Sequence, residues 1–431
     1  MPHETFHYPT LKAVQDTASS LNTFLPLSEE IPSVFAPLNL GGRMIENRIA
    51  FQPMEGSDGT EEGAPGPFTI RRYERFAKAG PGLIWFEAVA AVKEGRASAH
   101  QLFLTEDNAD AFRCLNERMR EICMKENGYV PLIVMQATNS GRYAKPSGYP
   151  EPMIAYSCPP LEEAPLPRER ILTDDQLHHY EEAFENAARL SQRAGFDGMD
   201  VKCCHRYLAS ELLSAYTRTG EYGGSYENRT RFVKNAYRAA KAGSTGDFFL
   251  TSRLNVYDGF SYPYGFGVHE GSLEPDLDEP IRLIRELREE FNIPLINVTM
   301  GNPYKNPHVN RPYDRGNYIP DEHPITGLGR MMQGIADIQT AIPDLPVLGS
   351  AFTYLRQFSI NLAAGMVSGG HCAMAGFGRM AFAYPDFIKE ARETGRIDKK
   401  NACVTCGKCA QLLRGGGPAG CVLHDREVYT L

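Results

Sequence analysis

The chain has 431 residues, of which 42% are hydrophobic and 23% charged, a balance that excludes a largely disordered protein. Its formal net charge of −8 argues against a protein that binds nucleic acid or an anionic membrane surface through a basic field. It has no apolar run of about 18 residues and no signal-peptide pattern near Met1, so we expect a cytoplasmic protein outside the membrane.

Eight short apolar segments rich in β-branched residues recur along the chain and predict β-strands. Longer helical patterns separate them, such as 174–194 and 277–291, and Thr173 and Asp174 supply capping oxygens at the start of the first. The predicted strands are 45–54, 82–89, 130–137, 198–203, 248–254, 294–300, 346–351 and 371–375.

Eight strand–helix repeats favour an α/β fold, a closed (β/α)8 TIM barrel. A doubly wound sheet is the alternative, but it would normally carry a dinucleotide-binding loop after an early strand, and the sequence has none there. The long segments 139–172 and 301–327 would be lids or substrate walls at the catalytic end. We expect an N-terminal extension over 1–34, the barrel over 35–396 and a cysteine-rich tail over 397–431.

Four of the ten cysteines fall in the tail with the spacing C-x2-C-x2-C-x11-C, namely Cys403, Cys406, Cys409 and Cys421. Four soft thiolates this close together suit an iron–sulfur cluster or zinc. Zinc sites more often use two separated C-x2-C pairs, so the crowding of three cysteines favours the cluster. The G-x-G-x-x-G pattern at 415–420 lacks the βαβ unit of a dinucleotide site, and we interpret these glycines as turns.

The segment GFDGMDVKCCHRYLASELLSAYTRTGEYGGSYENRTRF, residues 195–232, resembles the old yellow enzyme family closely. Further matches follow at the ends of the predicted strands, and the resemblance extends over about 35–389. These matches are Pro53 and Met54, Gln136 with Gly141 and Arg142, Arg253, Gly349 and Ser350, and the run Gly376, Phe377, Gly378 and Arg379.

With the cysteine tail, the chain resembles the branch that contains 2,4-dienoyl-CoA reductase, bile-acid-type enoate reductases and trimethylamine dehydrogenase. The resemblance implies an FMN cofactor and a [4Fe-4S] cluster held by the four tail cysteines. The family's third cysteine usually stands one residue further along, which is a departure here. Members often append an FAD/NAD(P) module that this sequence does not include, so we expect an external electron donor: ferredoxin, a flavoprotein or an NAD(P)H-oxidising partner.

The resemblance also implies which residues contact FMN. Pro53, Met54, Gln136 and Arg253 would contact the flavin ring, where Arg253 could stabilise the anionic reduced form. The loops after the last two strands are the usual phosphate site of a barrel. The residues expected there are Gly349, Ser350, Gly378 and Arg379.

Tyr207 is the candidate acid. The resemblance implies that a tyrosine protonates the α-carbon of an activated alkene, and a phenol is protonated at neutral pH and can donate if it lies within hydrogen-bond reach. The family polarises the substrate carbonyl with His-x-x-His or His-x-x-Asn, and here the two positions are Lys202 and His205. Lys202 departs from the pattern: it could donate to an enolate oxygen, or form a salt bridge that leaves His205 alone. Glu55, next to Met54, has no explanation at this level.

Three functions remain open. The first is an ene-reductase acting on a small-molecule enoate, enone or enoyl thioester, with electrons entering through the cluster. The second is an amine dehydrogenase of the trimethylamine dehydrogenase type. The third is a zinc-stapled barrel that binds a partner. A homo-oligomer is possible, and Tyr304 and His308 in the loop 301–327 could contact substrate or act as a second acid.

Overall fold

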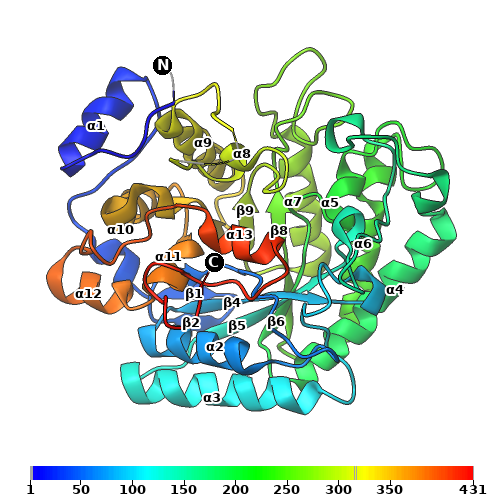
Figure 1. Cartoon of the computed structure of the whole chain (residues 1–431), viewed down its shortest axis with the longest axis horizontal. Helices are drawn as coiled ribbons and strands as arrows, with labels where there is room; N and C mark the ends of the chain where they lie inside the picture. The colour runs from blue at the N-terminus through cyan, green and yellow to red at the C-terminus, as the bar shows by residue number, and fades with distance from the viewer. Residues whose placement is uncertain (1–2, 315, 317, 431) are drawn as a thin grey trace.

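Parallel strands alternate with helices along the chain and close into a barrel in the computed structural model, which describes residues 3–314, 316 and 318–430 (Figure 1). β7 and β8 are separated only by Ser252; β7 pairs with β6 and β8 with β9, so together they act as one barrel strand and close the ring. The predicted TIM barrel is therefore confirmed. In barrel order the strands are β3 (Ile49–Phe51), β4 (Leu83–Ala90), β5 (Leu132–Thr138), β6 (Gly198–Val201), β7 (Phe249–Thr251) with β8 (Arg253–Asn255), β9 (Ile296–Thr299), β10 (Val347–Gly349) and β11 (Met374–Phe377).

The helices surround the barrel and begin and end at local signals in the sequence. Thr173 caps the start of α4, as predicted, and forms a capping box with Gln176, whereas the Asp174 carboxylate accepts instead from Arg218 and the Glu221 N–H. α2 and α3 end at Gly80 and Gly128, which adopt the left-handed conformation that glycine tolerates best. The helices are α1 (Leu11–Ser20), α2 (Pro67–Ala79), α3 (Ala109–Asn127), α4 (Asp174–Arg193), α5 (Leu208–Leu213), α6 (Tyr226–Ala242), α7 (Asp278–Phe291), α8 (Pro307–Asn310), α9 (Pro324–Ala341), α10 (Ser359–Ser368), α11 (Arg379–Ala383), α12 (Phe387–Thr394) and α13 (Lys408–Arg414).

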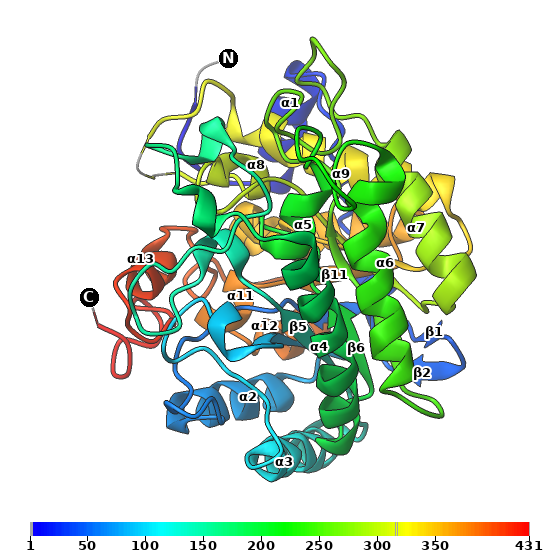
Figure 2. The ribbon, with the colours of Figure 1, turned by 90° about the vertical axis from the view of Figure 1, so that its right-hand side faces the viewer.

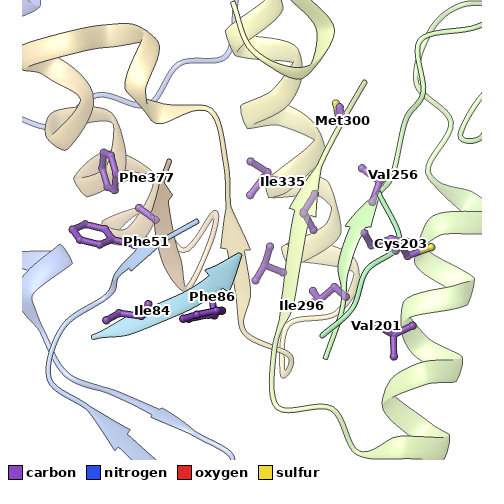
Figure 3. Packing of buried hydrophobic residues seen from close by; sticks show 14 of the residues in the cluster. Phe51, Ile84, Phe86, Val201, Cys203, Val256, Ile296, Met300, Ile335 and Phe377 are labelled. Carbon is purple, nitrogen blue, oxygen red and sulfur yellow. The ribbon is translucent and has the colours of Figure 1, made fainter. Parts of the chain in front are cut away.

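Alternation along the strands divides the core into two clusters. In β3, Ile49 and Phe51 join the large cluster between strands and helices, whereas Ala50 joins the small cluster inside the barrel. Figure 3 shows part of the large cluster, with Phe51, Phe86 and Phe377 packed between strands and helices. Trp85 belongs to the interior cluster and is fully buried.

A hairpin of β1 (Leu38–Leu40) and β2 (Arg43–Ile45) lies on the side of the barrel opposite to the C-terminal tail (Figure 2). It was not predicted, because the expected strand 45–54 runs through the chain reversal between β2 and β3. Asn47 stabilises that reversal: its side chain accepts hydrogen bonds from the N–H groups of Ile49 and Gly82, and it donates one to the Gly80 carbonyl. The last strand is also shifted, from the expected 371–375 to Met374–Phe377, where it pairs with β3.

The C-terminal tail folds back over the end of the barrel where the strands finish (Figure 2). The Ala419 N–H donates to the Gly56 carbonyl at 2.7 Å, in the loop after β3, and Arg414 donates to the Pro303 carbonyl at 2.9 Å, in the loop after β9. Asp425 pairs with Arg71 and Arg75 of α2 at 2.7 and 2.6 Å. Among the helices of the described ranges, none has the length and apolarity required to cross a bilayer.

Candidate functional site

A cavity of about 300 Å³, here called the inner cavity, lies at the carboxyl ends of the strands beneath the tail. This is the end of a barrel at which loops from different strands meet, and active sites form there. It is lined by Pro53, Met54, Glu55, Ala97, Ser98, Tyr143, Lys145, Lys202, His205, Tyr207, Arg253, Pro303, Tyr304, Asn310, Arg311, Arg379, Phe382, Cys409, Ala410, Leu413, Arg414 and Ala419.

Asp200, fully buried in β6, organises one half of the polar layer beneath the inner cavity. Its carboxyl group accepts hydrogen bonds from Gln136 Nε2 at 2.6 Å, Trp85 Nε1 at 2.8 Å and the Arg253 N–H at 2.8 Å. Burial raises the pKa of Asp200 to about 6, and these hydrogen bonds oppose the shift. The Gln136 Nε2 group is therefore engaged by Asp200, and Gln136 is not among the residues that line the inner cavity; its contact with a flavin stays a prediction.

The other half of the layer centres on Gln52, which the sequence analysis did not single out. Gln52 Nε2 donates to Asn297 Oδ1 and to Ser350 Oγ, each at 3.1 Å, and Asn297 returns a hydrogen bond at 2.8 Å. Ser350 is thus held to the first strand, and Gly349 accepts from the same amide at 3.3 Å. The alternation in β3 could have identified Gln52, because it stands two residues after the inward-facing Ala50.

Several arginines at the inner cavity have no carboxylate partner. Arg253, Arg311, Arg379 and Arg414 form no ion pair with any residue in the described part of the chain. Burial lowers the pKa of Arg253, and burial followed by repulsion from Arg379 lowers that of Arg311 to about 9. The chain is acidic overall, so this uncompensated positive charge indicates a site built for anionic groups.

Two buried nitrogen atoms provide a test of whether a flavin nucleotide fits. Arg253 Nε and Arg379 Nη1 find no hydrogen-bond partner among the residues that the structure describes. A Cβ at Gly378 would approach Met54 Sδ to 2.8 Å, so the backbone at this loop lies close to the cavity wall. Unsatisfied guanidinium groups and a close-lying glycine loop suit a phosphate and an anionic ring, and the residues present fit FMN.

Lys202, Glu55 and Tyr207 form a compact polar group in the cavity wall. Lys202 Nζ donates to Glu55 Oε1 at 2.8 Å, and it stands 3.7 Å from the centroid of the Tyr207 ring. The Tyr207 hydroxyl donates to the same carboxylate, with Oη to Oε distances of 3.0 and 3.2 Å. Burial, followed by the negative charge of Glu55, raises the pKa of Tyr207 well above its usual value, so the phenol stays protonated.

This arrangement explains two residues that the sequence left open. Lys202 stands at the first histidine of the family's His-x-x-His or His-x-x-Asn pattern, and Glu55, next to Met54, is its partner. The two residues neutralise each other, so neither presents a bare charge to the cavity. His205 is left as the single imidazole at the cavity wall.

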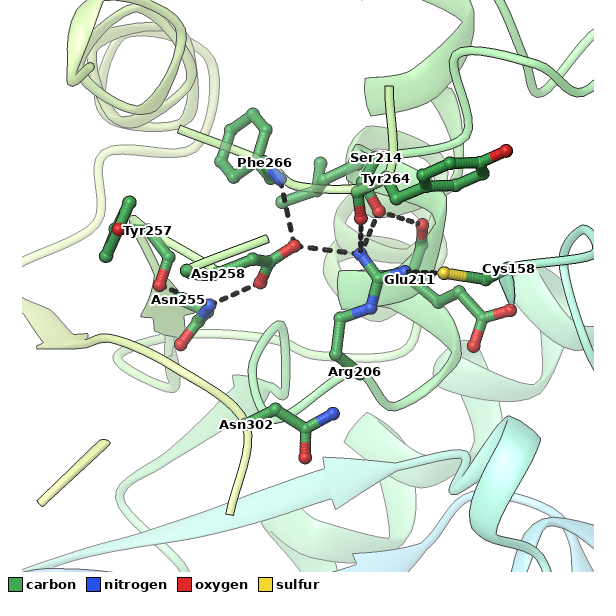
Figure 4. Close-up of polar contacts among 12 residues, drawn as sticks. Cys158, Arg206, Glu211, Ser214, Asn255, Tyr257, Asp258, Tyr264, Phe266 and Asn302 are labelled. Atoms are coloured by element: carbon green, nitrogen blue, oxygen red, sulfur yellow. Dashed lines mark hydrogen bonds and ion pairs between the residues drawn. The ribbon is translucent and has the colours of Figure 1, made fainter. Parts of the chain in front are cut away.

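His205 lies in a strained turn directly after β6. His205 and Arg206 both adopt left-handed backbone conformations, with φ of 64° and 61°, which residues other than glycine and asparagine adopt rarely. Arg206 is fully buried, and its guanidinium donates to Asp258 Oδ2 at 2.8 Å (Figure 4). It also donates to Tyr156 Oη at 2.9 Å. These hydrogen bonds of the buried Arg206 side chain hold the turn in place. Its neighbours His205 and Tyr207 line the inner cavity.

The environment of His205 keeps its ring neutral. Burial lowers the pKa of His205 well below its usual value, and the positive charges of Arg253 and Lys202 act in the same direction. Asn310 Nδ2 lies 3.5 Å from His205 Nε2. A neutral imidazole can donate one hydrogen bond from its protonated nitrogen to a substrate oxygen.

Tyr304, from the loop after β9, lines both the inner cavity and a second space of about 410 Å³, here called the outer cavity; Arg311, Ala410 and Arg414 also line both. The outer cavity lies between that loop and α13, and Lys305, Arg311 and Arg414 line it. His308, the other residue singled out in this loop, lies away from the inner cavity and contacts Tyr318 and Glu322.

The tail cysteines lie near one another beside the inner cavity. Burial raises the pKa of Cys403 to about 12, to which the thiols of Cys409 and Cys421 contribute, and Cys409 and Cys406 also raise that of Cys421. Backbone N–H groups of Thr405 and His424 donate to the Cys403 and Cys421 sulfurs at 3.4 Å, as at many metal thiolates.

No three histidine, cysteine or acidic side chains in the described ranges converge on one point as ligands of a single metal ion do. A four-iron cluster occupies space between its ligands and holds them further apart than one zinc ion does. Four sulfur donors of the right chemistry are present, with Arg311 and Arg379 close by to balance negative charge. These residues therefore fit an iron–sulfur cluster by donor type and charge.

The predicted residues divide into three groups in space. The inner cavity brings together Pro53, Met54, Lys202, His205, Tyr207, Arg253, Arg379 and Cys409. A second group lies outside its lining: Gln136, Gly349, Ser350 and Gly378. Cys406 lines the outer cavity, and Cys403 and Cys421 lie in the tail without lining either space.

Comparison with known sequences finds a matching protein family and related proteins. A model of the NADH:flavin oxidoreductase / NADH oxidase family matches residues 33–269. The NADPH dehydrogenase of Bacillus pumilus is 32% identical over 228 residues, covering 52% of this chain and 64% of the relative. The NADH oxidase of Thermoanaerobacter brockii is 26% identical over 388 residues, covering 87% of this chain and 53% of the relative. The chain thus spans less than two thirds of the length of either relative.

Solved structures share the barrel fold. A 2-naphthoyl-CoA reductase in complex with 2-naphthoyl-CoA superposes with a TM-score of 0.75 at 20% identity, covering 92% of this chain and 57% of that chain. Histamine dehydrogenase from Rhizobium gives 0.68 at 20% identity, covering 92% and 52%. An old yellow enzyme homologue from Zymomonas mobilis gives 0.64 at 20% identity, covering 86% and 95%.

Proposed function

Because the chain belongs to the NADH:flavin oxidoreductase / NADH oxidase family, we propose that it is an FMN-dependent ene-reductase that reduces an electron-poor C=C bond in a small molecule. One observation carries this proposal. The inner cavity combines a protonated phenol, a neutral imidazole and guanidinium groups that no carboxylate in the described chain neutralises. These are the groups that alkene reduction requires: a proton donor, a donor to the activating oxygen and a site for anionic cofactor groups.

FMN, when bound, would supply a hydride to the β-carbon of the alkene. Pro53, Met54 and Arg253 would contact its ring. The loops with Gly349, Ser350, Gly378 and Arg379 would hold its phosphate, with Ser350 fixed by Gln52. Gln136, whose Nε2 group is held by Asp200, would also contact the ring.

The chain's own residues would handle the substrate's oxygen and the proton. His205 would donate a hydrogen bond to the carbonyl or carboxylate that activates the alkene, and thereby stabilise the enolate-like charge that develops. Tyr207 would deliver its proton to the α-carbon. Lys202 would act through Glu55 and the Tyr207 ring, rather than as a second donor to the substrate oxygen.

Electrons would reach the flavin through a [4Fe-4S] cluster bound by Cys403, Cys406, Cys409 and Cys421. The support is the four neighbouring sulfur donors, the N–H groups directed at two of them and the nearby arginines. The electron donor would be an external partner such as ferredoxin, a flavoprotein or an NAD(P)H-oxidising protein. The cations around the inner cavity disfavour the amine dehydrogenase alternative, because its substrates are cationic.

The proposal can be tested on the full chain prepared without oxygen. Flavin and iron contents are measured first, and then the dithionite-reduced protein is mixed with α,β-unsaturated acids, ketones and thioesters while flavin reoxidation is followed. We expect reoxidation by at least one of these compounds, slower by about 10²-fold or more in Tyr207→Phe. Tyr222→Phe is the matched control, because this buried phenol bonds to His178 outside both cavities. Absence of reoxidation by the whole panel, or equal rates in the two variants, would contradict the proposal.

A further inference from the structure

The hydroxyl groups of Tyr207 and Tyr304 lie 2.9 Å apart, within hydrogen-bonding distance. The two residues differ in overall exposure, because Tyr207 is only 2% exposed and Tyr304 is 38% exposed, although both hydroxyl groups are buried where they meet. Tyr304 lines both cavities, whereas Tyr207 lines only the inner one. The pair of phenols therefore links a buried hydroxyl to the outer cavity.

Tyr207 has few possible sources of a proton. Its hydroxyl oxygen contacts Tyr304 and the two carboxylate oxygens of Glu55. In these contacts Glu55 is the acceptor, from the Tyr207 hydroxyl and from Lys202. Lys202 directs its ammonium to Glu55 and stands over the ring, with no hydrogen bond to the Tyr207 oxygen. Among the side chains in the described part of the protein, Tyr304 is thus the one hydroxyl donor in contact with Tyr207.

We propose that Tyr304 returns a proton to Tyr207 after each turnover and takes its own from water in the outer cavity. This inference rests on the proposed function, in which Tyr207 is the acid. The Tyr207 O–H bond breaks as a C–H bond forms at the substrate α-carbon. The Tyr304 proton then moves to the Tyr207 oxygen, and a solvent proton restores Tyr304. The sum is one proton taken from water per alkene reduced, and the electron pair comes with the hydride.

The polar environment favours transfer in that direction. Burial is the largest cause that raises the pKa of both phenols, and Glu55 raises both further. The hydrogen bond between the two acts oppositely on them: it raises the pKa of Tyr207 and lowers that of Tyr304. The geometry agrees, because the single O–H of Tyr207 donates to Glu55, which leaves the Tyr304 hydroxyl as the donor and the Tyr207 oxygen as the acceptor in the 2.9 Å contact.

The neighbours of Tyr304 hold its ring in place for this role. The Tyr143 ring stacks on it with centroids 3.9 Å apart. Asn302 fixes both residues, because its Oδ1 accepts from the Tyr304 N–H at 2.8 Å and its Nδ2 donates to the Tyr143 hydroxyl at 2.8 Å. Tyr143 does not hydrogen-bond to Tyr207, so it provides a matched control from the same stack.

The test measures how fast the Tyr207 hydroxyl exchanges with water, in the protein without substrate. In a mixture of H2O and D2O, the ζ-carbon of ¹³C-labelled tyrosine gives two signals when hydroxyl exchange is slow and one when it is fast. Tyr207→Phe identifies the signal. We expect Tyr304→Phe, which keeps the stacked ring, to slow the exchange by at least about tenfold, and Tyr143→Phe to leave it unchanged.

An exchange rate in Tyr304→Phe that equals or exceeds that of the unmodified protein would overturn the proposal. A merely structural role predicts faster exchange, because loss of packing would admit water.

A second measurement uses turnover: reduced protein equilibrated in D2O is mixed with substrate in excess H2O and stopped after one turnover. Tyr304→Phe should retain several-fold more deuterium at the product α-carbon, and equal retention would count against the relay. If the exchange result holds but no alkene is reduced by any form, the relay stands and the proposed function fails.

Discussion

Replacement of Glu55 by glutamine should make Tyr207 a much stronger acid. The carboxylate lies 3.0 and 3.2 Å from the phenol oxygen and opposes the formation of a tyrosinate. The amide keeps the shape of the side chain but removes its charge. It also leaves the Lys202 ammonium, 3.7 Å from the ring centroid, without its counter-ion. Both changes favour the tyrosinate, so the pKa of Tyr207 should fall.

The size of the effect follows from the distance. Two unit charges about 3 Å apart at an effective dielectric constant of about 20 interact by about 5 kcal/mol, or about four pKa units. Partial neutralisation of Glu55 by Lys202 at 2.8 Å reduces this value in the unmodified protein. We therefore expect a fall of about one to three units, measured as the pH dependence of the Tyr207 ¹³Cζ signal.

Two further variants test whether the pKa of Tyr207 shifts in the direction that the electrostatic account predicts. Lys202→Met removes the balancing cation and should raise the pKa of Tyr207, and the double variant should lie between the single ones. Glu286→Gln is the matched control, because Glu286 accepts a hydrogen bond from Tyr226 at 2.7 Å outside the cavities and should leave Tyr207 unchanged. A Tyr207 pKa that rises or stays constant in Glu55→Gln would refute the electrostatic account of this group.

Three other outcomes are expected. Arg206→Met leaves the buried Asp258 without its partner and should lower the free energy of unfolding by about 3–5 kcal/mol at neutral pH. Burial raises the pKa of Asp258, so this deficit should shrink as the pH falls, and a deficit that grows in acid would contradict the account. Burial raises the pKa of Glu87 to about 7 from 4.5, so its contribution to stability is complete below pH 4.5 and is lost as the pH rises through about 7. Denaturant unfolding should show stability that falls as the pH rises through this range, a loss absent in Glu87→Gln; identical curves would argue against it. Cys421→Ser should lower the iron content and the visible absorbance of the anaerobic protein, whereas Cys372→Ser, outside the tail, should not.

Local patterns in the sequence determined most of the fold. The apolar strand segments, the cap at Thr173 and the alternation around Ala50 depend on neighbouring residues, so they can be interpreted without long-range contacts. The hairpin before β3 was missed because its chain reversal depends on Asn47, whose side chain bonds to Gly80 and Gly82, more than thirty positions away.

The sequence likewise predicted only part of the candidate site. Its residue types and their strand-end positions could be predicted, since they lie in short recognisable segments such as the one around His205 and Tyr207. The partner of Lys202 could not, because Glu55 is 147 positions away along the chain and Tyr304 is 97 positions from Tyr207. Which side chains meet across a barrel depends on strand register and side-chain direction, and a register change of one residue turns a side chain to the other face. Short segments of sequence were therefore enough to predict the barrel and the residue types at its site, whereas the pairing of Lys202 with Glu55 and the meeting of two phenols at the cavity wall depend on the folded chain.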